Sequence, residues 1–533
     1  MRRRSRPTSW AISLQRVSSS NPGRRLFRAL NIRALQLGPT DFSHQFAITP
    51  DAQWAYEPAL SFEDPEYDFA VIDRILTDQE AVILSRIVRA HSLFVLDSVP
   101  LSKKMAFMMK SRCGSVVARQ DLKNLLEVRL PNFFGRPYGE KFDPHTLAVA
   151  PGFQGKVCWH GFTEAVLTGF FGDQMRQAAF WRGNIPVEAG QAIDFWLEYE
   201  KDDSVTIELQ IVQFVTGSVS AVQKIWTFDE KAMRRPVTID NPNQDGPVFV
   251  SLNAKGRGKL RIVALHDRYS RRGEGAFLPK SERVVTSSRE EIFAYLDPGD
   301  LKPPLCVYFS GYKTMEGFEG YRMMRRMGVP FLLISESRLE GGAFYLGTDE
   351  YEHKLRFVIE AAMRRLGFNR DQVIFSGLSM GTFGALYYGT TIRPAYIIVG
   401  KPLVSLGNMA VAERLDRPGG FPTSLDVLWK QYGSLDANAV DRMNRRFWTK
   451  FDRTDWSGRT FCAAYMIEDD YDADAYAQLI SHVRGRGAKV IGKGLHGRHN
   501  DDTSGVVNWF LRQYRRVLQD GFGRKQDDNG ETK

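Results

Sequence analysis

Apolar residues divide the chain into three regions, each with its own spacing. From 300 to 520, short apolar runs alternate with stretches in which apolar residues recur every three or four positions. The first spacing is typical of buried strands and the second of amphipathic helices. Strands that alternate with helices form parallel sheets covered on both faces. The pattern therefore predicts a doubly wound α/β domain over 300–520.

The two preceding regions have other patterns. Between 46 and 140, two short apolar runs, 67–73 and 92–97, flank a segment with helical spacing over 78–90, which predicts a small α/β domain. This domain has no glycine-rich phosphate loop, and we interpret it as a docking or structural module. Between 145 and 272, apolar and polar residues alternate over short runs separated by polar turns, which predicts a β-sandwich of jelly-roll type.

Two features of the expected sandwich allow more than one interpretation. Exposed aromatic residues on it could bind sugars, but aromatic side chains at alternate strand positions more often belong to the core. The aromatic candidates are Trp159, Phe162, Phe170, Phe171, Trp181, Trp196 and Trp226. The polar run 266–272 could face a neighbouring active site, and we interpret it as a solvated linker.

Positive charge is concentrated at the N-terminus. The 533 residues carry a net charge of +10, and the first 40 contain nine arginines and no acidic residue, so the remainder carries 10 − 9 = +1. We expect 1–45 to be a disordered basic leader and 521–533 to be a disordered tail. A nearly neutral folded body gives no support for a nucleic-acid partner.

The sequence predicts a soluble, cytoplasmic protein. No stretch approaches the ~20 apolar residues of a membrane-spanning helix, and the leader lacks the apolar core of a secretory signal. We therefore expect at most peripheral contact with the inner face of a membrane. The four cysteines have neither disulfide nor metal-ligand spacing, so we expect reduced thiols, no metal and no cofactor.

A glycine-flanked serine is the strongest chemical signal. The sequence GLSMG at 377–381 follows an apolar run and precedes a segment of small residues. This is the G-x-S-x-G nucleophile elbow of α/β-hydrolase-like domains, in which a serine stands on a sharp turn between strand and helix. We expect Ser379 to be the nucleophile. Its oxyanion hole would use the backbone N–H of Met380 and that of Gly311 or Tyr312.

An elbow serine needs a histidine as general base and an acid that orients the histidine. Two histidines follow the last expected strand, and we prefer His499 to His496 because the residues after it can cap the final helix and hold the loop. The four candidate acids are Glu468, Asp469, Asp470 and Asp472. The first two come directly off a strand and are preferred, and the last is the runner-up. Acids at these positions also favour the N-terminus of the next helix.

Several of these stretches together carry a family resemblance. They are FSGY at 309–312, EGF at 316–318, GLSMG at 377–381, EDDYD at 468–472 and GRHNDD at 497–502. With them, the last two hundred or so residues resemble the accessory secretory protein two family of the accessory Sec system.

The resemblance implies a small N-terminal domain, a β-sandwich and an α/β-hydrolase-like domain. It implies O-acetylation of N-acetylglucosamine on glycosylated adhesins, together with a role in their export and other accessory Sec components as partners. Carried over to this chain, Ser379 would be the nucleophile, His499 the base and Glu468 or Asp469 the acid.

We therefore expect serine-dependent acyl transfer to a carbohydrate or glycoprotein substrate. Two alternatives stay open: a non-catalytic export scaffold and a plain carbohydrate esterase. The scaffold predicts that replacing Ser379 leaves chemistry unchanged, and the esterase predicts hydrolysis without an acceptor sugar.

Overall fold

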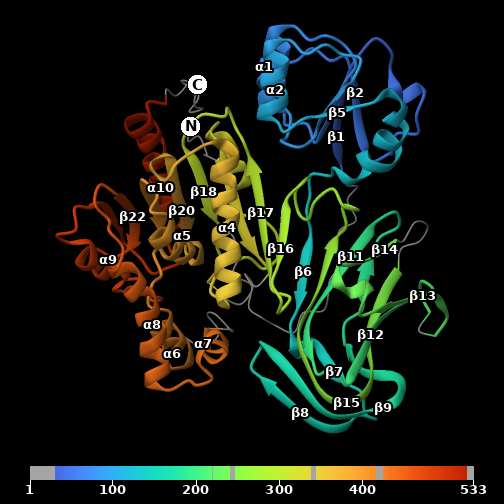
Figure 1. The fold of residues 1–533 in the computed structure, drawn as a ribbon, viewed down its shortest axis with the longest axis vertical. Helices are drawn as coiled ribbons and strands as arrows, with labels where there is room; N and C mark the ends of the chain where they lie inside the picture. The colour runs from blue at the N-terminus through green and yellow to red at the C-terminus, as the bar shows by residue number, and fades with distance from the viewer. Residues whose placement is uncertain (1–30, 219, 241–245, 338–343, 416–423, 525–533) are drawn as a thin grey trace, which may run out of the picture.

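The computed structural model describes residues 31–218, 220–240, 246–337, 344–415 and 424–524, which form three sheets (Figure 1). The sheets follow one another along the chain and appear blue, green and yellow to red in Figure 1. Most of the expected leader and of the expected tail lies outside the described residues.

The N-terminal unit is a parallel sheet in the order β2-β1-β3-β4-β5. As expected, the helix α1 (Asp78–Ile87) lies between β3 (Phe69–Ile72) and β4 (Leu93–Leu96). The expected leader is wrong from residue 32 onward. The strand β1 (Ile32–Leu37) is an inner strand that pairs with β2 and β3, and four of its six side chains pack into the apolar core. The remaining main elements are β2 (Ala52–Tyr56), α2 (Lys103–Ser111) and β5 (Ser115–Val117).

The middle unit is one connected antiparallel sheet organised around β15 (Gly246–Tyr269). Different parts of β15 pair with β9 (Glu164–Trp181), β11 (Ala192–Lys201) and β12 (Val205–Phe214). The other strands are β6 (Gly139–Phe142), β7 (Leu147–Val149), β8 (Gln154–His160), β10 (Ile185–Val187), β13 (Val222–Asp229) and β14 (Val237–Asp240). The antiparallel sheet is confirmed, whereas its jelly-roll arrangement stays a prediction.

The polar run 266–272 is not a solvated linker. His266 and Asp267 continue β15 and are fully buried, and Arg271 is buried because its guanidinium donates to backbone carbonyls such as that of Asn132, 2.8 Å away. Among the aromatic candidates, Phe171, Trp181 and Trp196 are buried, Phe170 and Trp226 are half-buried, and Trp159 and Phe162 are exposed. Sugar binding by the exposed pair stays a prediction.

The C-terminal unit is a sheet in the order β16-β17-β19-β18-β20-β21-β22-β23. Its antiparallel pair β16 and β17 precedes the expected boundary at 300, and the strands from β19 to β23 are parallel. The strands are β16 (Glu282–Val285), β17 (Glu291–Asp297), β18 (Leu305–Phe309), β19 (Phe331–Glu336), β20 (Val373–Leu378), β21 (Tyr396–Gly400), β22 (Thr460–Met466) and β23 (Lys489–Leu495).

Helices cover both faces of this sheet. They are α3 (Tyr321–Arg326), α4 (Asp349–Leu366), α5 (Met380–Ile392), α6 (Leu406–Leu415), α7 (Ser424–Tyr432), α8 (Ala437–Asp452), α9 (Ala475–Val483) and α10 (Thr503–Arg516). No helix among the described residues is both long enough and apolar enough to span a bilayer.

The neighbouring strands β18 and β20 send the chain to opposite faces. Val307 of β18 lies in the apolar core shared with α4 and α5, whereas Tyr308 lies in the core shared with α3 and α10. The chain continues from β18 to α3 on one face and from β20 to α5 on the other. A crevice at the carboxyl ends of two such strands is where open α/β sheets bind ligands.

Candidate active site

Ser379 stands on a strained turn between β20 and α5. Its backbone has φ +50° and ψ −121°, a conformation that residues with a side chain rarely adopt. Neither flanking glycine leaves room for a side chain. A Cβ on Gly377 would collide with the carbonyl of Gly381, and a Cβ on Gly381 would collide with the carbonyl of Phe309. The turn is fixed by a hydrogen bond of 2.8 Å from the Ser379 N–H to the carbonyl of Gly400.

A continuous line of hydrogen bonds runs from this serine into the protein. Ser379 Oγ lies 2.8 Å from His499 Nε2, and His499 Nδ1 lies 2.9 Å from Asp469 Oδ2. Only 1% of His499 and 8% of Asp469 is exposed, so water does not compete for these contacts. A carboxylate at Nδ1 keeps the proton on that nitrogen and leaves Nε2 to accept from the serine hydroxyl.

Neighbouring groups hold Asp469 ionised and His499 in place. Burial alone would raise the pKa of Asp469, but the hydrogen bonds from His499 and from the backbone N–H groups of Tyr471 and Asp472 keep that pKa below its ordinary value. The Tyr471 ring stacks on the imidazole with centroids 4.1 Å apart and planes 8° apart. The His499 N–H donates to Asp470 Oδ1 at 3.1 Å. Asp470, Tyr471 and Asp472 all belong to the EDDYD stretch, but nothing else in the sequence indicates that they support His499 and Asp469.

The structure does not bring Glu468 to His499. The exposed Glu468 carboxylate instead lies 3.3 Å from His496 Nδ1 and accepts from the N–H of Gly497. The choice of Glu468 as an orienting acid is therefore wrong for this arrangement, because consecutive residues of the loop point in different directions.

The runner-up acid, Asp472, has a different structural role. One oxygen of its carboxylate accepts from the N–H groups of Val404 and Ser405, both at 2.7 Å. Burial raises the pKa of Asp472 to about 6. This buried carboxyl connects the loop after β22 to the segment after β21.

The expected oxyanion donors differ in their surroundings. Met380 is the first residue of α5, so its N–H has no acceptor within the helix. The N–H of Gly311 donates to Glu319 Oε2 at 2.6 Å, which makes Gly311 unsuitable as a donor in this conformation. Glu319 itself has a raised pKa because its carboxyl group is buried. Of the two predicted residues on this loop, Tyr312 is the candidate that stays.

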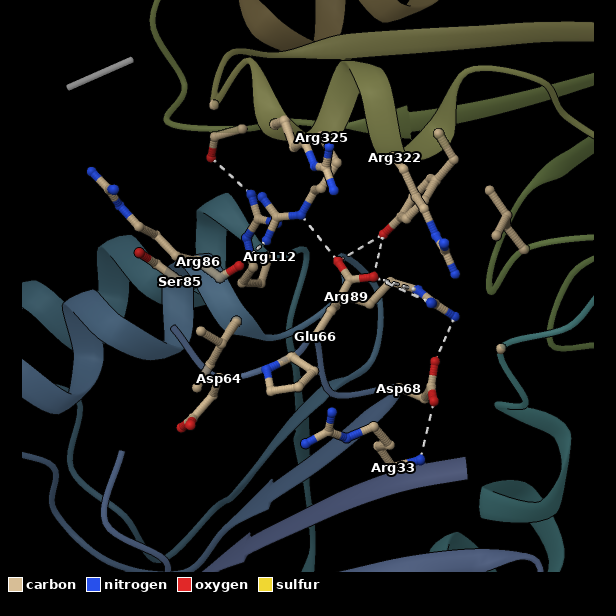
Figure 2. Close-up of a pocket in the computed structure, with 18 of the residues that line it drawn as sticks. Arg33, Asp64, Glu66, Asp68, Ser85, Arg86, Arg89, Arg112, Arg322 and Arg325 are labelled. Atoms are coloured by element: carbon tan, nitrogen blue, oxygen red, sulfur yellow. Dashed lines mark hydrogen bonds and ion pairs between the residues drawn. The ribbon is translucent and has the colours of Figure 1, made fainter. Parts of the chain in front are cut away.

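A separate cavity of about 1380 Å³ lies between the N-terminal unit and α3 (Figure 2). Its lining contains none of Ser379, His499 and Asp469. Figure 2 shows Glu66 within it, where the carboxylate accepts from Arg325 at 3.0 Å and from Arg89 at 3.2 Å. Of these two pairs, the one with Arg325 of α3 joins the N-terminal and C-terminal units.

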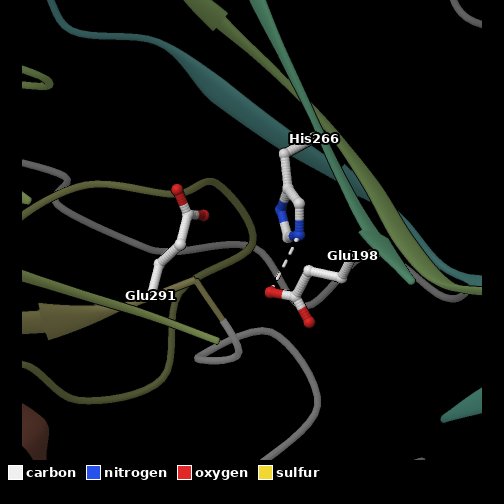
Figure 3. Close-up of side chains that lie close together, drawn as sticks. All are labelled: Glu198, His266 and Glu291. Atoms are coloured by element: carbon white, nitrogen blue, oxygen red, sulfur yellow. Dashed lines mark ion pairs between the residues drawn. The ribbon is translucent and has the colours of Figure 1, made fainter. Parts of the chain in front are cut away.

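A buried group of acids and a histidine lies between the middle and C-terminal units (Figure 3). Glu198, His266 and Glu291 place possible ligand atoms within 4.8 Å of one another. Arginines already neutralise Glu291, since both its oxygens accept from Arg268 and one also accepts from Arg283. We interpret this group as an ion-pair cluster and not as a metal site.

Comparison with known proteins identifies the family. A family model described as the accessory Sec system GspB-transporter matches residues 32–524. An accessory Sec system protein of Streptococcus gordonii is 38% identical over 509 residues, which cover 93% of this chain and 99% of that protein. One of Staphylococcus aureus is 40% identical over 393 residues, covering 74% and 75%.

A solved structure agrees with the sequence comparisons. The Glycosylation Associate Protein (Gap123) complex of Streptococcus agalactiae contains a chain that is 33% identical, with a TM-score of 0.82, and the match covers 94% of this chain and 100% of that one. The chain therefore belongs to the accessory Sec system GspB-transporter family, the family that its motifs resemble.

Proposed function

We propose that this protein transfers an acyl group, through Ser379, to a sugar hydroxyl of a glycoprotein that is exported by an accessory Sec system. The observation that carries the proposal is the buried line of contacts from Ser379 through His499 to Asp469, with distances of 2.8 and 2.9 Å. Such a line lets a neutral imidazole remove the serine proton while a carboxylate stabilises the imidazolium.

The first half of the reaction forms an acyl-enzyme. Ser379 Oγ attacks the carbonyl carbon of the acyl donor as His499 Nε2 takes the hydroxyl proton. The oxyanion that forms accepts hydrogen bonds from the N–H groups of Met380 and Tyr312. His499 then gives its proton to the leaving group, and the bond from carbon to that group breaks.

The second half transfers the acyl group to the sugar. A sugar hydroxyl enters the space left by the donor and loses its proton to His499 Nε2 as its oxygen attacks the acyl carbon. When the tetrahedral intermediate collapses, the bond between the acyl carbon and Ser379 Oγ breaks, the sugar ester leaves, and Ser379 Oγ takes the proton from His499 Nε2. Asp469, ionised because its pKa is lowered, stabilises the imidazolium in both halves.

We take the proposed acyl acceptor, cellular location and partners from the family. The relatives are accessory Sec system proteins, and the similar solved chain belongs to a complex of glycosylation-associated proteins. We infer that this chain modifies N-acetylglucosamine on an adhesin-like glycoprotein in the cytoplasm, and that other accessory Sec components bind it. Any membrane contact would be peripheral.

Acetyl transfer to N-acetylglucosamine tests this proposal. Purified wild type, Ser379→Ala and His499→Ala are incubated with p-nitrophenyl acetate, with and without the sugar, and p-nitrophenol and acetylated sugar are measured. His496→Ala is the matched control, because this exposed histidine is on the same loop and pairs with Glu468. We expect activity in the wild type and the control and a loss of at least about 10³-fold in the other two.

Each alternative function predicts a different result. Equal, weak p-nitrophenol release by all four proteins would overturn the acyl-transfer proposal and favour the scaffold. Ser379-dependent release without acetylated sugar would favour an esterase.

A further inference from the structure

The loop between β18 and α3 is tied to the antiparallel sheet through one side chain. Glu316 Oε1 lies 2.6 Å from His266 Nδ1, and Glu316 Oε2 accepts from Arg268 Nε at 2.6 Å. The Glu316 N–H also donates to the carbonyl of Gly139 in β6 at 2.9 Å. His266 and Arg268 belong to β15, so both the side chain and the backbone of Glu316 are held by the middle unit.

We propose that His266 and Arg268 are positioning residues for acyl transfer: by holding Glu316 they fix the loop 310–320 so that the Tyr312 N–H meets the oxyanion. The inference rests on the function proposed above. In this proposal the middle, antiparallel unit affects the rate of acyl transfer, although none of its residues belongs to the line of contacts from Ser379 to Asp469.

The other contacts of the loop explain why Glu316 matters. Ser310 and Gly317 are anchored through their carbonyls, which accept from Tyr345 and Ser335, each at 2.7 Å. Between these anchors the Gly311 N–H donates to Glu319 Oε2 at 2.6 Å and Lys313 Nζ donates to the Phe318 carbonyl at 3.1 Å. These contacts lie within the loop itself, whereas Glu316 ties the loop to the middle unit. An oxyanion donor must be in place before the charge develops, and a displacement of 1 Å costs about 10²-fold in rate.

The contact of Glu316 with His266 and Arg268 is charged on both sides and buried. His266 is faced by Glu198 from β11, Glu291 from β17 and Glu316 from the loop, with Arg268 beside it on its own strand. Burial alone would lower the pKa of His266, but Glu316 and Glu198 raise that pKa to about 9. With His266 protonated, three carboxylates meet three cations, the third being Arg283 on β16. Buried charges persist only when they are balanced in this way.

The substitution Glu316→Gln tests the tether, because it keeps the shape of the side chain and removes its charge. The matched control is Glu274→Gln. Glu274 is as buried as Glu316, with 7% of each residue exposed, and its carboxylate accepts from Arg129 of the N-terminal unit. It lies more than 30 residues before the loop in the sequence. Two quantities are measured: kcat and KM for p-nitrophenyl acetate, and amide hydrogen exchange of peptides that cover 310–320.

We expect Glu316→Gln to lower kcat by about 10-fold or more with KM nearly unchanged, and to speed exchange of the loop by a similar factor. Glu274→Gln should change neither quantity. Full kcat in Glu316→Gln, or an unchanged exchange rate, would overturn the positioning role. Wild type without Ser379-dependent turnover would instead overturn the proposed function, so the two failures are distinguishable.

A second variant covers the case in which Glu316→Gln does not fold. In the wild type, kcat should fall as the pH rises through about 9, where His266 loses its proton. His266→Gln should already have a low kcat at pH 7 and lack that decrease. The same pH profile in both proteins would also overturn the positioning role.

Discussion

Asp469 Oδ2 lies 2.9 Å from His499 Nδ1, whereas Glu468, the preceding residue, contacts His496. This pairing makes a sharp prediction for two neighbouring acids. Asp469→Asn should lower kcat roughly 10³- to 10⁴-fold, because an amide cannot both fix the tautomer of His499 and stabilise its charge. Glu468→Gln should keep near wild-type kcat. The measurement is steady-state turnover of p-nitrophenyl acetate, and equal losses in both variants would contradict the assignment of Asp469.

The glycine that follows Ser379 by two residues should not tolerate a methyl group. In Gly381→Ala the new Cβ meets the backbone carbonyl of Phe309, which cannot move without displacing β18. We expect a loss of folding stability of at least about 1–3 kcal/mol together with a loss of activity. Gly183→Ala is the control, since a Cβ there meets nothing within 4 Å. Thermal unfolding checks the prediction, and equal Tm values for the two variants would argue against it.

Asp472 should make stability fall as the pH rises through 6. The carboxyl ionises near its ordinary pKa of about 4 in the unfolded chain, but near 6 in the folded protein. The folded state therefore holds more protons between these values, and the stability present below pH 4 decreases by up to about 3 kcal/mol as the pH passes 6. Asp472→Asn keeps an oxygen for Val404 and Ser405 and removes the ionisation. The Tm of Asp472→Asn should rise relative to that of the wild type between pH 4 and 7. A difference in Tm that does not change over this pH range would contradict the prediction.

His266 should make stability fall in the same direction, but at a higher pH. Its pKa is about 9 in the folded protein and about 6.5 when unfolded, so its contribution to stability is complete below pH 6.5 and is lost as the pH rises through 9. The difference amounts to about 3 kcal/mol. The Tm of His266→Gln should lie below that of the wild type at pH 6 and approach it at pH 10. His496→Gln, in which an exposed histidine is replaced, should follow the wild type at both pH values.

The features that the sequence predicts well depend on local patterns. The helix α4 (Asp349–Leu366) can be read from the sequence, because its apolar stripe, the Thr348 cap and Gly367 in the left-handed conformation all lie within one segment. The turn at Ser379 is also signalled locally, by a glycine two positions to either side of the serine, although Gly381 packs against Phe309 of the distant strand β18. The antiparallel character of the middle unit follows from a pattern with a period of two.

The features that the sequence does not predict depend on contacts between distant segments. Which acid reaches His499 is decided by the path of a loop, and Asp469 and Glu468 are equivalent on composition alone. The Gly311 N–H is taken by Glu319, which depends on how the loop folds back on itself. The sequence places His266 in a linker because a run of charges is usually solvated, whereas Glu198 of its own unit and Glu316 of the C-terminal unit neutralise it here.

The charge cluster around His266 limits how the units of this protein can be exchanged with those of relatives. The middle unit contributes Glu198, His266 and Arg268, a net charge of +1, and the C-terminal unit contributes Arg283, Glu291 and Glu316, a net charge of −1. A chimera that takes one unit from a relative would bury an unmatched charge unless both halves of the cluster came along. These six positions should therefore be inherited together, and units joined across this boundary should fold only as matched pairs.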